Sequence, residues 1–441
     1  MHLTTQEVPV QNLEIGMYVS RLDVPWVQTP FPIQGFYITK QEELELLTHY
    51  CSVVYIDQFL SKVDVTSKLF LANTSPAKNG HAPHLDAKTL RLINEKAKFK
   101  PRKETYTITR GLKREVKNAS VMYDQIMGQM SSMYRNMTQH GYVDMREAQK
   151  VSSQMVSSIV KNPNALAWLC RIGENNRTLH QQAVRSAVWG LIFARHLGLA
   201  KQDLIDICTA LLLAPIGKCQ LPKELLYSRQ SKDEELEYQT HIELTLAETS
   251  KIFAQAHQVN YILSAYCERN NGTGYPRNLI GNRIPFLARV TGISEYYEQL
   301  INPYPGADAL TPVEAISHLY NVRGELFQKE LVEAFIQAIG IYPTGSLVKL
   351  SNNAIAVVLE QPENFRLRPK VAIITDHMNI HLDKPKIVNL AKDPVDHNGV
   401  PLFISQSLPS TSTDINASEI HEKLFGNGNW LSTLVPFSNA V

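Results

Sequence analysis

The sequence has little of what marks secreted, zinc-ribbon or membrane-spanning proteins. Its 441 residues include only five cysteines, which are scattered and form no CxxC pair. This excludes a zinc ribbon and a disulfide framework, and it fits a reducing cytoplasm. The best apolar run, ICTALLLAPIG, is shorter than the ~20 residues that a membrane-spanning helix needs. The beginning, MHLTTQEVPV, lacks the basic and apolar stretches of a signal peptide. We therefore expect a cytoplasmic protein without a transmembrane segment.

The sequence also lacks an excess of charge of either sign. Lys and Arg number 44 against 42 for Asp and Glu, so the net charge of +2 gives no field that would attract nucleic acid. We expect no nucleic-acid partner. One basic run, KAKFKPRK, follows the Ser-, Asn-, Pro- and Gly-containing stretch NTSPAKNGHAP. Such a run could touch acidic lipid or nucleic acid, but a solvated linker is the commoner outcome.

What is present is the composition of an ordinary globular protein, with 44% hydrophobic and 20% charged residues. At about 100–200 residues per domain the length predicts two to four domains. The change of pattern along the chain predicts a mainly α fold, with a small α+β domain before the helices and a small β extension after them. The predicted divisions are an N-terminal α+β domain at 1–60, a linker at 61–104, a helical connector at 105–164, a helical domain at 165–340, a β extension at 341–400 and a loosely ordered tail at 401–441.

Hydrophobic periodicity supports these divisions. Near the N-terminus, QEELELLTHY predicts one helix and CSVVYID a short strand. The segment HQQAVRSAVWGLIFARHLGL places its apolar residues at helical spacing. After residue 340, NAIAVVLE and PKVAIITD are short apolar runs typical of strands. Further helical patterns occupy 201–214, 234–256, 257–268, 284–300 and 312–338.

One polar segment carries a family resemblance. The sequence ERNNGTGYPRNLIGNRIPFLARV resembles the signature of the HD-GYP family, which runs H-H-E-R-x-D-G-x-G-Y-P, then G-x-x-I-P, then A-R-I. Upstream, ALLLAPIGKCQLP is similar to the family's A-L-L-H-D-I-G-K-I-x-I-P. The matching residues are Glu268, Arg269, Gly272, Gly274, Tyr275, Pro276, Gly281, Ile284, Pro285, Ala288 and Arg289.

The resemblance extends to both sides of this segment. GMYVSRLD, PWVQTPF and VVYID look like the uncharacterised domain that often precedes HD-GYP modules, and IYPTGSLVKLSNN resembles the extension that often follows them. The resemblance implies an HD-type helical bundle and a hydrolase of the bacterial messenger cyclic di-GMP. It also implies a centre of two or three metal ions, usually iron or manganese, which clamp the scissile phosphate and activate a water.

The positions that match the family's metal ligands have mostly lost their donor groups. Ala214 and Pro215 stand where the family has its defining His-Asp pair, and neither side chain can bind a metal ion. The loop Asp becomes Asn271, and the basic R-P-Y-K/R segment reads NPYP at 302–305. The other changed ligand positions are Asn176 for a Glu, and Tyr266 and Cys267 for a pair of histidines.

Three residues remain as candidate remnants of the metal site. His180 and His241 keep the family's histidines, and Glu295 keeps a carboxylate where the family has an Asp. They could bind a single ion, or they could be hydrogen-bonded residues of a half-polar pocket. Lys218 could contact a phosphate or pair with a helix end or a carboxylate. Cys267 could be a reactive thiol, although a buried cysteine is more often inert.

The loop itself is retained where the ligands are lost. Gly272 and Gly274 allow a tight turn, and in the family Tyr275 and Pro276 belong to a loop linked to GGDEF-type cyclases. The loop could therefore serve protein contacts, or it could be kept because the fold needs it. The resemblance implies GGDEF-type cyclases or other signalling proteins as partners, and cyclic di-GMP as a ligand.

The preferred hypothesis is a degenerate HD-GYP protein of cyclic di-GMP signalling, which acts without catalysis through protein contacts or residual nucleotide binding. No cofactor is then expected, and any bound metal would be iron or manganese. A second hypothesis is an active cyclic di-GMP phosphodiesterase with an altered site of His180, His241, Cys267 and Glu295. A third, a phosphohydrolase of another substrate, meets the same shortage of ligands.

Overall fold

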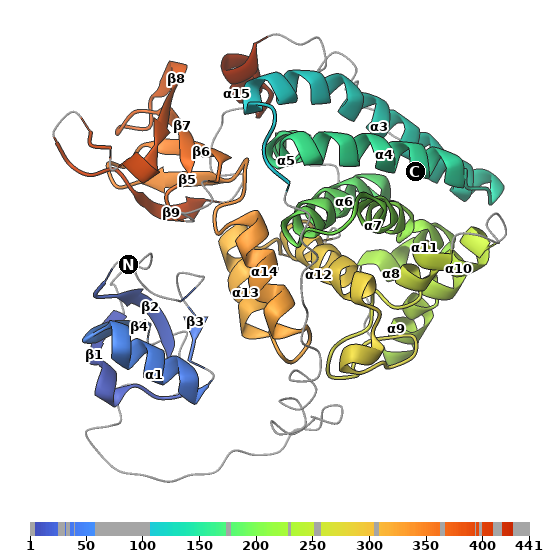
Figure 1. The fold of residues 1–441 in the computed structure, drawn as a ribbon, viewed down its shortest axis with the longest axis horizontal. Coiled ribbons are helices and arrows are strands. Elements are labelled where there is room, and N and C mark those ends of the chain that lie inside the picture. The colour runs from blue at the N-terminus through green and yellow to red at the C-terminus, as the bar shows by residue number, and fades with distance from the viewer. Residues whose placement is uncertain are drawn as a thin grey trace.

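Three groups of elements follow one another along the chain in the computed structural model (Figure 1): a small sheet with one helix, a large helical body and a second sheet. This is the mainly α fold that the sequence predicts. Neither the linker at 61–104 nor its basic run lies among the described residues. The structure describes residues 5–24, 31, 36–38, 40–57, 106–172, 178–227, 231–250, 257–303, 308–361, 367–392, 394–396, 399–408 and 417–426.

The N-terminal group is a four-stranded antiparallel sheet in the order β1-β4-β2-β3. In β4 the buried Val54 and Ile56 alternate with the half-buried Tyr55, which is the period-two pattern of a strand with one covered face. The helix and the strand predicted here from QEELELLTHY and CSVVYID are both confirmed. The elements are β1 (Thr5–Pro9), β2 (Tyr18–Leu22), β3 (Phe36–Tyr37), α1 (Gln41–Tyr50) and β4 (Val53–Asp57).

The helical body begins with two long antiparallel helices and continues through shorter ones. Asp144 starts α4 by accepting hydrogen bonds from the backbone of Arg146 and Glu147, and Gly141 ends α3 at a φ of +61°. The helices are α3 (Leu112–His140), α4 (Met145–Lys161), α5 (Pro163–Ile172), α6 (Leu179–His196), α7 (Lys201–Leu213), α8 (Lys223–Tyr227), α9 (Lys232–Gln239), α10 (His241–Ser250), α11 (His257–Leu263), α12 (Phe286–Ile301), α13 (Pro312–Asn321) and α14 (Lys329–Ile339), with 3-10 turns η4 (Ile216–Gln220) and η5 (Gly281–Arg283).

Some helices are shorter than the periodicity predicts. The pattern at 234–256 is divided at Thr240 between α9 and α10, and the pattern at 257–268 ends at Leu263. The pattern at 312–338 is divided by the turn 322–328, in which Gly324 adopts a φ of +77°. Apolar residues continue at helical spacing through these breaks, so periodicity alone does not reveal them. Among the described helices, none has the length and apolar composition needed to cross a membrane.

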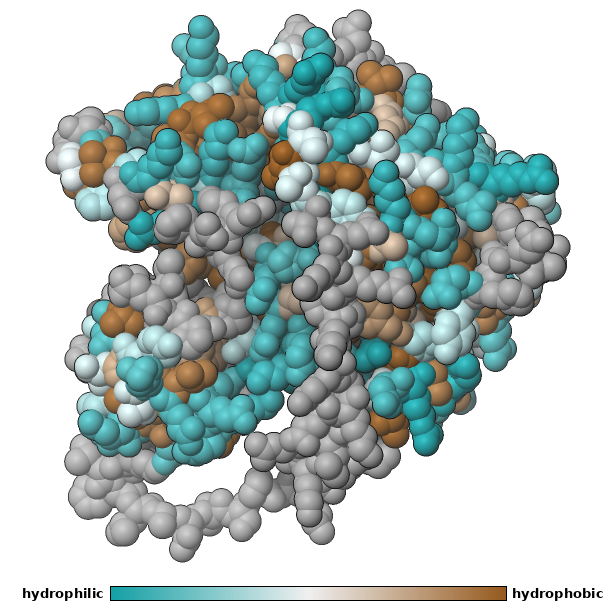
Figure 2. Space-filling view, in the orientation of Figure 1, coloured by the Kyte–Doolittle hydropathy of each residue, from teal (hydrophilic) through white to brown (hydrophobic). Residues whose placement is uncertain are grey.

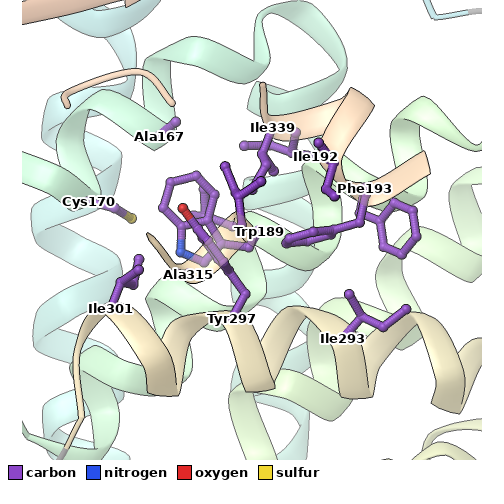
Figure 3. Close-up of a cluster of buried hydrophobic side chains, with 14 of the residues drawn as sticks. Ala167, Cys170, Trp189, Ile192, Phe193, Ile293, Tyr297, Ile301, Ala315 and Ile339 are labelled. Atoms are coloured by element: carbon purple, nitrogen blue, oxygen red, sulfur yellow. The ribbon is translucent and has the colours of Figure 1, made fainter. Parts of the chain in front are cut away.

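The core of the body is built around α6, in which all side chains from Gln182 to Ala194 are buried. A helix that is covered on all sides must contact several others, and α6 packs against α7, α12 and α14. Figure 3 shows the aromatic centre of this packing. The ring centroids of Trp189 and Tyr297 lie 5.6 Å apart, in an edge-to-face arrangement.

The C-terminal sheet has five antiparallel strands in the order β8-β7-β6-β5-β9, which confirms the predicted β extension. Its central strands are largely buried, whereas β8 is mostly exposed on an edge. Hydrophobic and hydrophilic residues are interspersed on the face seen in Figure 2. The strands are β5 (Leu347–Leu350), β6 (Ile355–Glu360), β7 (Lys370–Thr375), β8 (His381–Asn389) and β9 (Ile404–Leu408).

The segment after residue 400 corrects one prediction. We expected a loosely ordered tail at 401–441, but β9 pairs with β5 and α15 (Ala417–Phe425) packs on α3 and α5 (Figure 1). The indole of Trp168 donates a hydrogen bond to Nδ1 of His421 at 3.1 Å, and the ring of Phe425 lies 5.2 Å away. These apolar anchors outweigh the polar composition of the tail. Residues 427–441 lie outside the described part.

Candidate functional site

The described residues at the ligand positions come from five separate segments: the start of α6, the end of α7, the start of α10, the loop after α11, and α12. The turn η4 reaches α10 because Gly217 has no side chain. A Cβ there would lie 2.1 Å from the carbonyl oxygen of His241. Because no Cβ is present, the two segments can approach closely, and the amide of Gly217 donates a 2.9 Å hydrogen bond to Oγ1 of Thr245. The backbone at Ala214 and Pro215 is thereby held against α10.

His241 is fully buried and both of its ring nitrogens have partners. Nδ1 lies 2.7 Å from the carbonyl oxygen of Tyr238, and because a carbonyl only accepts, Nδ1 carries a hydrogen. Nε2 lies 3.1 Å from the hydroxyl of Tyr266, which can donate to it. The nitrogen that would face a metal ion is therefore engaged by a phenol.

Tyr266 occupies the space between these elements. Its hydroxyl also lies 3.4 Å from the carbonyl oxygen of Ala214, and its side chain is buried. Helix α12 passes so close that a Cβ on Gly292 would lie 2.4 Å from the carbonyl oxygen of Tyr266. Burial raises the pKa of Tyr266 well above its usual value, so the phenol stays protonated. A neutral hydrogen-bonding side chain thus fills the place of the first loop histidine.

Lys218 and Glu295 form a buried ion pair. The distance from Nζ to Oε1 is 3.8 Å, and Gln299 donates a further hydrogen bond to the same carboxylate. The Lys218 ammonium also lies 5.4 Å from the ring centroid of Tyr238. The sequence left two roles open for Lys218: contact with a phosphate, or pairing with a helix end or a carboxylate. In the structure Lys218 pairs with a carboxylate. The only carboxylate kept at a ligand position is therefore neutralised by a lysine.

Cys267 is buried next to this pair. Burial raises the pKa of its thiol to about 11, and the charge of Glu295 adds to the effect, whereas a hydrogen bond with Tyr275 opposes it. A thiol with this pKa is almost entirely protonated at neutral pH, and a protonated thiol is a poor metal ligand and nucleophile. The surroundings of Cys267 are those of an inert buried cysteine.

His180 lies at the start of α6. Its Nε2 is 3.4 Å from Oγ1 of Thr178, and its ring centroid is 6.2 Å from that of Tyr134. Burial, together with repulsion from Arg185 and Arg135, lowers its pKa to about 4. No group of three or more His, Cys, Asp or Glu side chains that could hold a metal ion occurs within the described ranges.

His180, His241 and Glu295 therefore do not assemble into a ligand set, and Asn176 lies outside the described residues. A centre of two divalent ions needs several His and carboxylate donors around each ion. At the matching positions the chain offers a methyl group, a proline ring, a phenol and a protonated thiol. The residues present do not fit such a centre.

The loop 268–281 is tightly held. The buried carboxylate of Glu268 accepts hydrogen bonds from the amides of Arg277, at 2.8 Å, and Leu279, at 2.9 Å. A Cβ on Gly274 would lie 2.2 Å from the amide nitrogen of Arg269, so only glycine fits. The Tyr275–Pro276 peptide bond is cis. These contacts fix the shape of the loop, which the sequence alone indicated only as a turn.

The loop exposes one set of residues and buries another. Arg269 stacks on the rings of Tyr296 and Phe327, with 5.4 and 5.0 Å between guanidinium and centroids. Gly272 adopts a φ of +82°, and Asn271 accepts hydrogen bonds from Thr273. The loop thus presents a polar, shaped surface without an acidic side chain at its Asp position. Its exposed members are Thr273, Pro276, Arg277 and Asn278.

Several contributors to the site were missed from the sequence. Tyr238 lies three residues before His241, at the end of α9, and this closeness in sequence could have been noticed. Asn302, at the first position of NPYP, donates a 2.9 Å hydrogen bond to the buried Glu298, whose other partners are Arg185 and Trp189. Residues 304 and 305 of NPYP lie outside the described part. The contacts of Glu298 with Arg185 and Trp189 are long-range, and no local pattern indicates them.

Comparison with known families divides the chain into three matches. A domain of unknown function, DUF3391, matches residues 5–148; an HD domain matches 171–331; and a KOW domain associated with HD domains matches 347–396. The resemblances stated for the N-terminal segment and for the helical domain are confirmed. The DUF3391 match also includes α3 and the start of α4.

Related proteins carry similar modules. A protein named cyclic di-GMP phosphodiesterase from Pseudomonas aeruginosa is 26% identical over 379 residues, which cover 83% of this chain and 84% of that protein. The cyclic di-GMP phosphodiesterase response regulator RpfG of Xanthomonas campestris is 30% identical over 155 residues, or 34% of this chain and 41% of that protein. A solved HDGYP-type protein from Bdellovibrio bacteriovorus aligns with a TM-score of 0.43 and 16% identity, over 75% of this chain and 98% of that one.

Proposed function

We propose that the chain, which contains an HD domain with a DUF3391 domain before it and a KOW domain after it, is an HD-GYP-type protein and a non-catalytic module of cyclic di-GMP signalling. The names of the relatives support the link to this messenger. The observation that carries the loss of catalysis is the hydroxyl of Tyr266 on Nε2 of His241, opposite Ala214 and Pro215.

The physical reason lies in the ligands and the charges. Hydrolysis of a phosphodiester by two metal ions needs the cations to lie about 3.5–4 Å apart, bridged and surrounded by anionic or imidazole donors. Here Ala214 and Pro215 provide no donor, and the ammonium of Lys218 lies 3.8 Å from the carboxylate of Glu295. A fixed positive charge at that place repels a metal cation. We derive no reaction step through a metal in this site.

The function that remains is binding. The loop 268–281 keeps a fixed shape through Glu268 and Gly274 and exposes Pro276, Arg277 and Asn278. A rigid loop loses little conformational entropy on association, which favours its use as a contact surface. We propose a GGDEF-type cyclase or another signalling protein as its partner. Residual binding of cyclic di-GMP is a second route by which the module could act.

The alternative is a phosphodiesterase with an altered metal site of His180, His241, Cys267 and Glu295. It would require the Tyr266 phenol to leave Nε2 of His241, the Cys267 thiol to lose its proton, and His180 to approach from the start of α6. Each change works against a contact or a burial described above, so we favour the non-catalytic proposal.

The deciding experiment is hydrolysis of cyclic di-GMP by the purified full chain, loaded anaerobically with iron(II) or manganese(II), beside an intact family member. We expect no linear or fully cleaved product from this chain while the family member is active. Product that disappears with a chelator would refute the proposal, and the Cys267→Ser variant would then test the altered site.

Binding is tested separately with purified components. A GGDEF-domain cyclase encoded in the same genome is titrated with the full chain and with Arg277→Ala. We expect the loop variant to bind at least about tenfold more weakly. Arg146→Ala is the control, because Arg146 is exposed on α4 and away from the loop. Equal affinity of all three proteins would exclude the loop as the contact surface.

A further inference from the structure

A cavity of about 150 Å³ lies between the N-terminal group and the helices α13 and α14. In Figure 1 the N-terminal sheet and α1 face these two helices. The rings of Phe36 and Tyr320 meet edge-to-face across the boundary, with centroids 6.0 Å apart. The cavity walls that matter for its chemistry come from both sides: Lys40, Glu42 and Glu43 from the N-terminal group, and Arg323, Lys329 and Glu333 from the helical body.

Two of the cations at the cavity are already paired. Arg323 is buried, forms an ion pair with Glu43 of α1, and lies 3.7 Å from the carboxylate of Glu333. Lys329 lies 3.9 Å from Glu42, whose side chain is 61% exposed, so this pair is weakened by solvent. These ion pairs join the two parts of the chain across the cavity.

Lys40 is the third cation that lines the cavity. It precedes α1 and is half-buried, and within the described ranges no carboxylate lies within the 4.0 Å of an ion pair from its ammonium. Burial lowers the pKa of Lys40, and the nearby charges of Lys329 and Arg323 lower it further, while the charges of Glu43 and Glu42 act in the opposite direction. The opposite wall carries Glu333, which lies 3.7 Å from Arg323. A bound anion would give the half-buried ammonium of Lys40 the direct charge partner that it lacks among the described residues.

We propose that this cavity is a binding site for a small anion, a phosphate or carboxylate group held between Lys40 and Lys329. Its volume equals that of about five water molecules, which suits inorganic phosphate or a short dicarboxylate and is too small for a cyclic dinucleotide. The site is separate from the HD-type site and does not depend on whether that site hydrolyses anything. An anion there would tie the N-terminal group more firmly to the helical body.

The cavity has a short physical connection to the loop 268–281. Arg323 belongs to the turn 322–328, and this turn accepts two hydrogen bonds from Asn270. The amide of Asn270 donates to the carbonyl of Leu326 at 2.8 Å, and its side chain donates to the carbonyl of Gly324 at 3.3 Å. Arg323 lines the cavity, so an anion bound there lies beside the turn that holds Asn270, which makes the site suited to regulation of the loop.

The test is calorimetric titration of the full chain with inorganic phosphate and, separately, with succinate, at constant ionic strength set by sodium chloride. We expect saturable binding of at least one probe with a dissociation constant below about 10 mM. Lys40→Gln and Lys329→Gln should each weaken it about tenfold or more. Lys201→Gln, an exposed lysine on α7, is the control and should bind normally.

The variants also distinguish binding from general effects on stability. Circular dichroism establishes that each variant is folded, and Lys201→Gln reports any effect of removing one surface charge. Hydrogen–deuterium exchange gives a second readout, since the bound anion should slow exchange in the peptide 268–281. Absence of saturable binding for both probes would overturn the proposal, as would unchanged affinity in both Lys40→Gln and Lys329→Gln.

Discussion

The hydroxyl oxygen of Tyr266 lies 3.1 Å from Nε2 of His241, and both side chains are buried. The other ring nitrogen donates to the carbonyl of Tyr238, so the histidine is held in one orientation and one tautomer. A metal-binding histidine is also oriented through its second nitrogen. Here the nitrogen that a metal ion would bind contacts the phenol of Tyr266 instead, so the hydrogen bond between them is part of the folded core.

Tyr266→Phe removes the hydroxyl and should lower the free energy of unfolding by about 1–2 kcal/mol, because a buried nitrogen of His241 loses a donor. Urea unfolding measures the difference. Tyr261→Phe is the matched control, since Tyr261 is 51% exposed and should change stability by less than about 0.5 kcal/mol. Equal stability of Tyr266→Phe and the wild type would mean that this hydrogen bond contributes nothing to stability.

Gly274→Ala should distort the loop 268–281, because the added Cβ would lie 2.2 to 2.5 Å from backbone atoms of residues 267–269. We expect a loss of about 1–3 kcal/mol or more, since backbone cannot move aside as a side chain can. Gly128→Ala in α3 is the control. Its Cβ would meet nothing within 4 Å, and the change should stabilise the helix by about 0.5–1 kcal/mol. A neutral effect of Gly274→Ala would show that the loop adapts.

Cys267 should resist thiol reagents in the folded protein. Burial raises its pKa to about 11, so at pH 8 only about one molecule in a thousand carries the thiolate. Cys219 has a similar pKa but is partly exposed, so it should be modified first. Mass spectrometry after timed alkylation follows each residue, and guanidinium should make all five cysteines reactive. Modification of Cys267 as fast as Cys219 would reopen its role as a reactive thiol.

The attachment of α15 should weaken in acid. Burial lowers the pKa of His421 to about 4, against 6.5 in an unfolded chain. Between these values the unfolded chain binds a proton that the folded chain does not, so stability falls as the pH falls, by up to about 1.4 kcal/mol per unit. Hydrogen–deuterium exchange of the peptide 417–426 at pH 7 and pH 5 measures the change.

His421→Gln can still accept the hydrogen bond from Trp168 but does not titrate, so it should lose most of this pH dependence. His140→Gln, at an exposed position on α3, should retain it. The prediction is wrong if His421→Gln and the wild type lose protection in this peptide equally between pH 7 and pH 5.

The sequence was sufficient for the order of the folded parts, and for the places where donor groups are missing. The loop could be identified because its glycines and its Tyr-Pro pair stand at fixed spacing. The sequence did not show that Lys218 pairs with Glu295. These residues are far apart in the chain, and the sequence offers each of them several candidate partners of opposite charge. Nor did it show that the Tyr266 hydroxyl meets His241, since the direction of a side chain depends on packing.

The tail was mispredicted for a related reason. Its Ser-, Thr- and Asn-rich composition outweighs the short segment ASEIHEKLF, whose apolar residues lie at helical spacing. A helix of nine residues is marginal alone and gains its stability from packing. That packing is provided by Trp168, a residue that local sequence cannot connect with it. The inter-domain contact of Arg323 with Glu43 escapes local patterns in the same way.

Trp168 and His421 are separated by 253 positions, and α15 is the last described element to leave the ribosome. During synthesis Trp168 is therefore made long before α15, the helix that packs against its indole. A product that stops short of residue 417 leaves an aromatic side chain of the helical body open to water, where chaperones and proteases recognise unfinished chains.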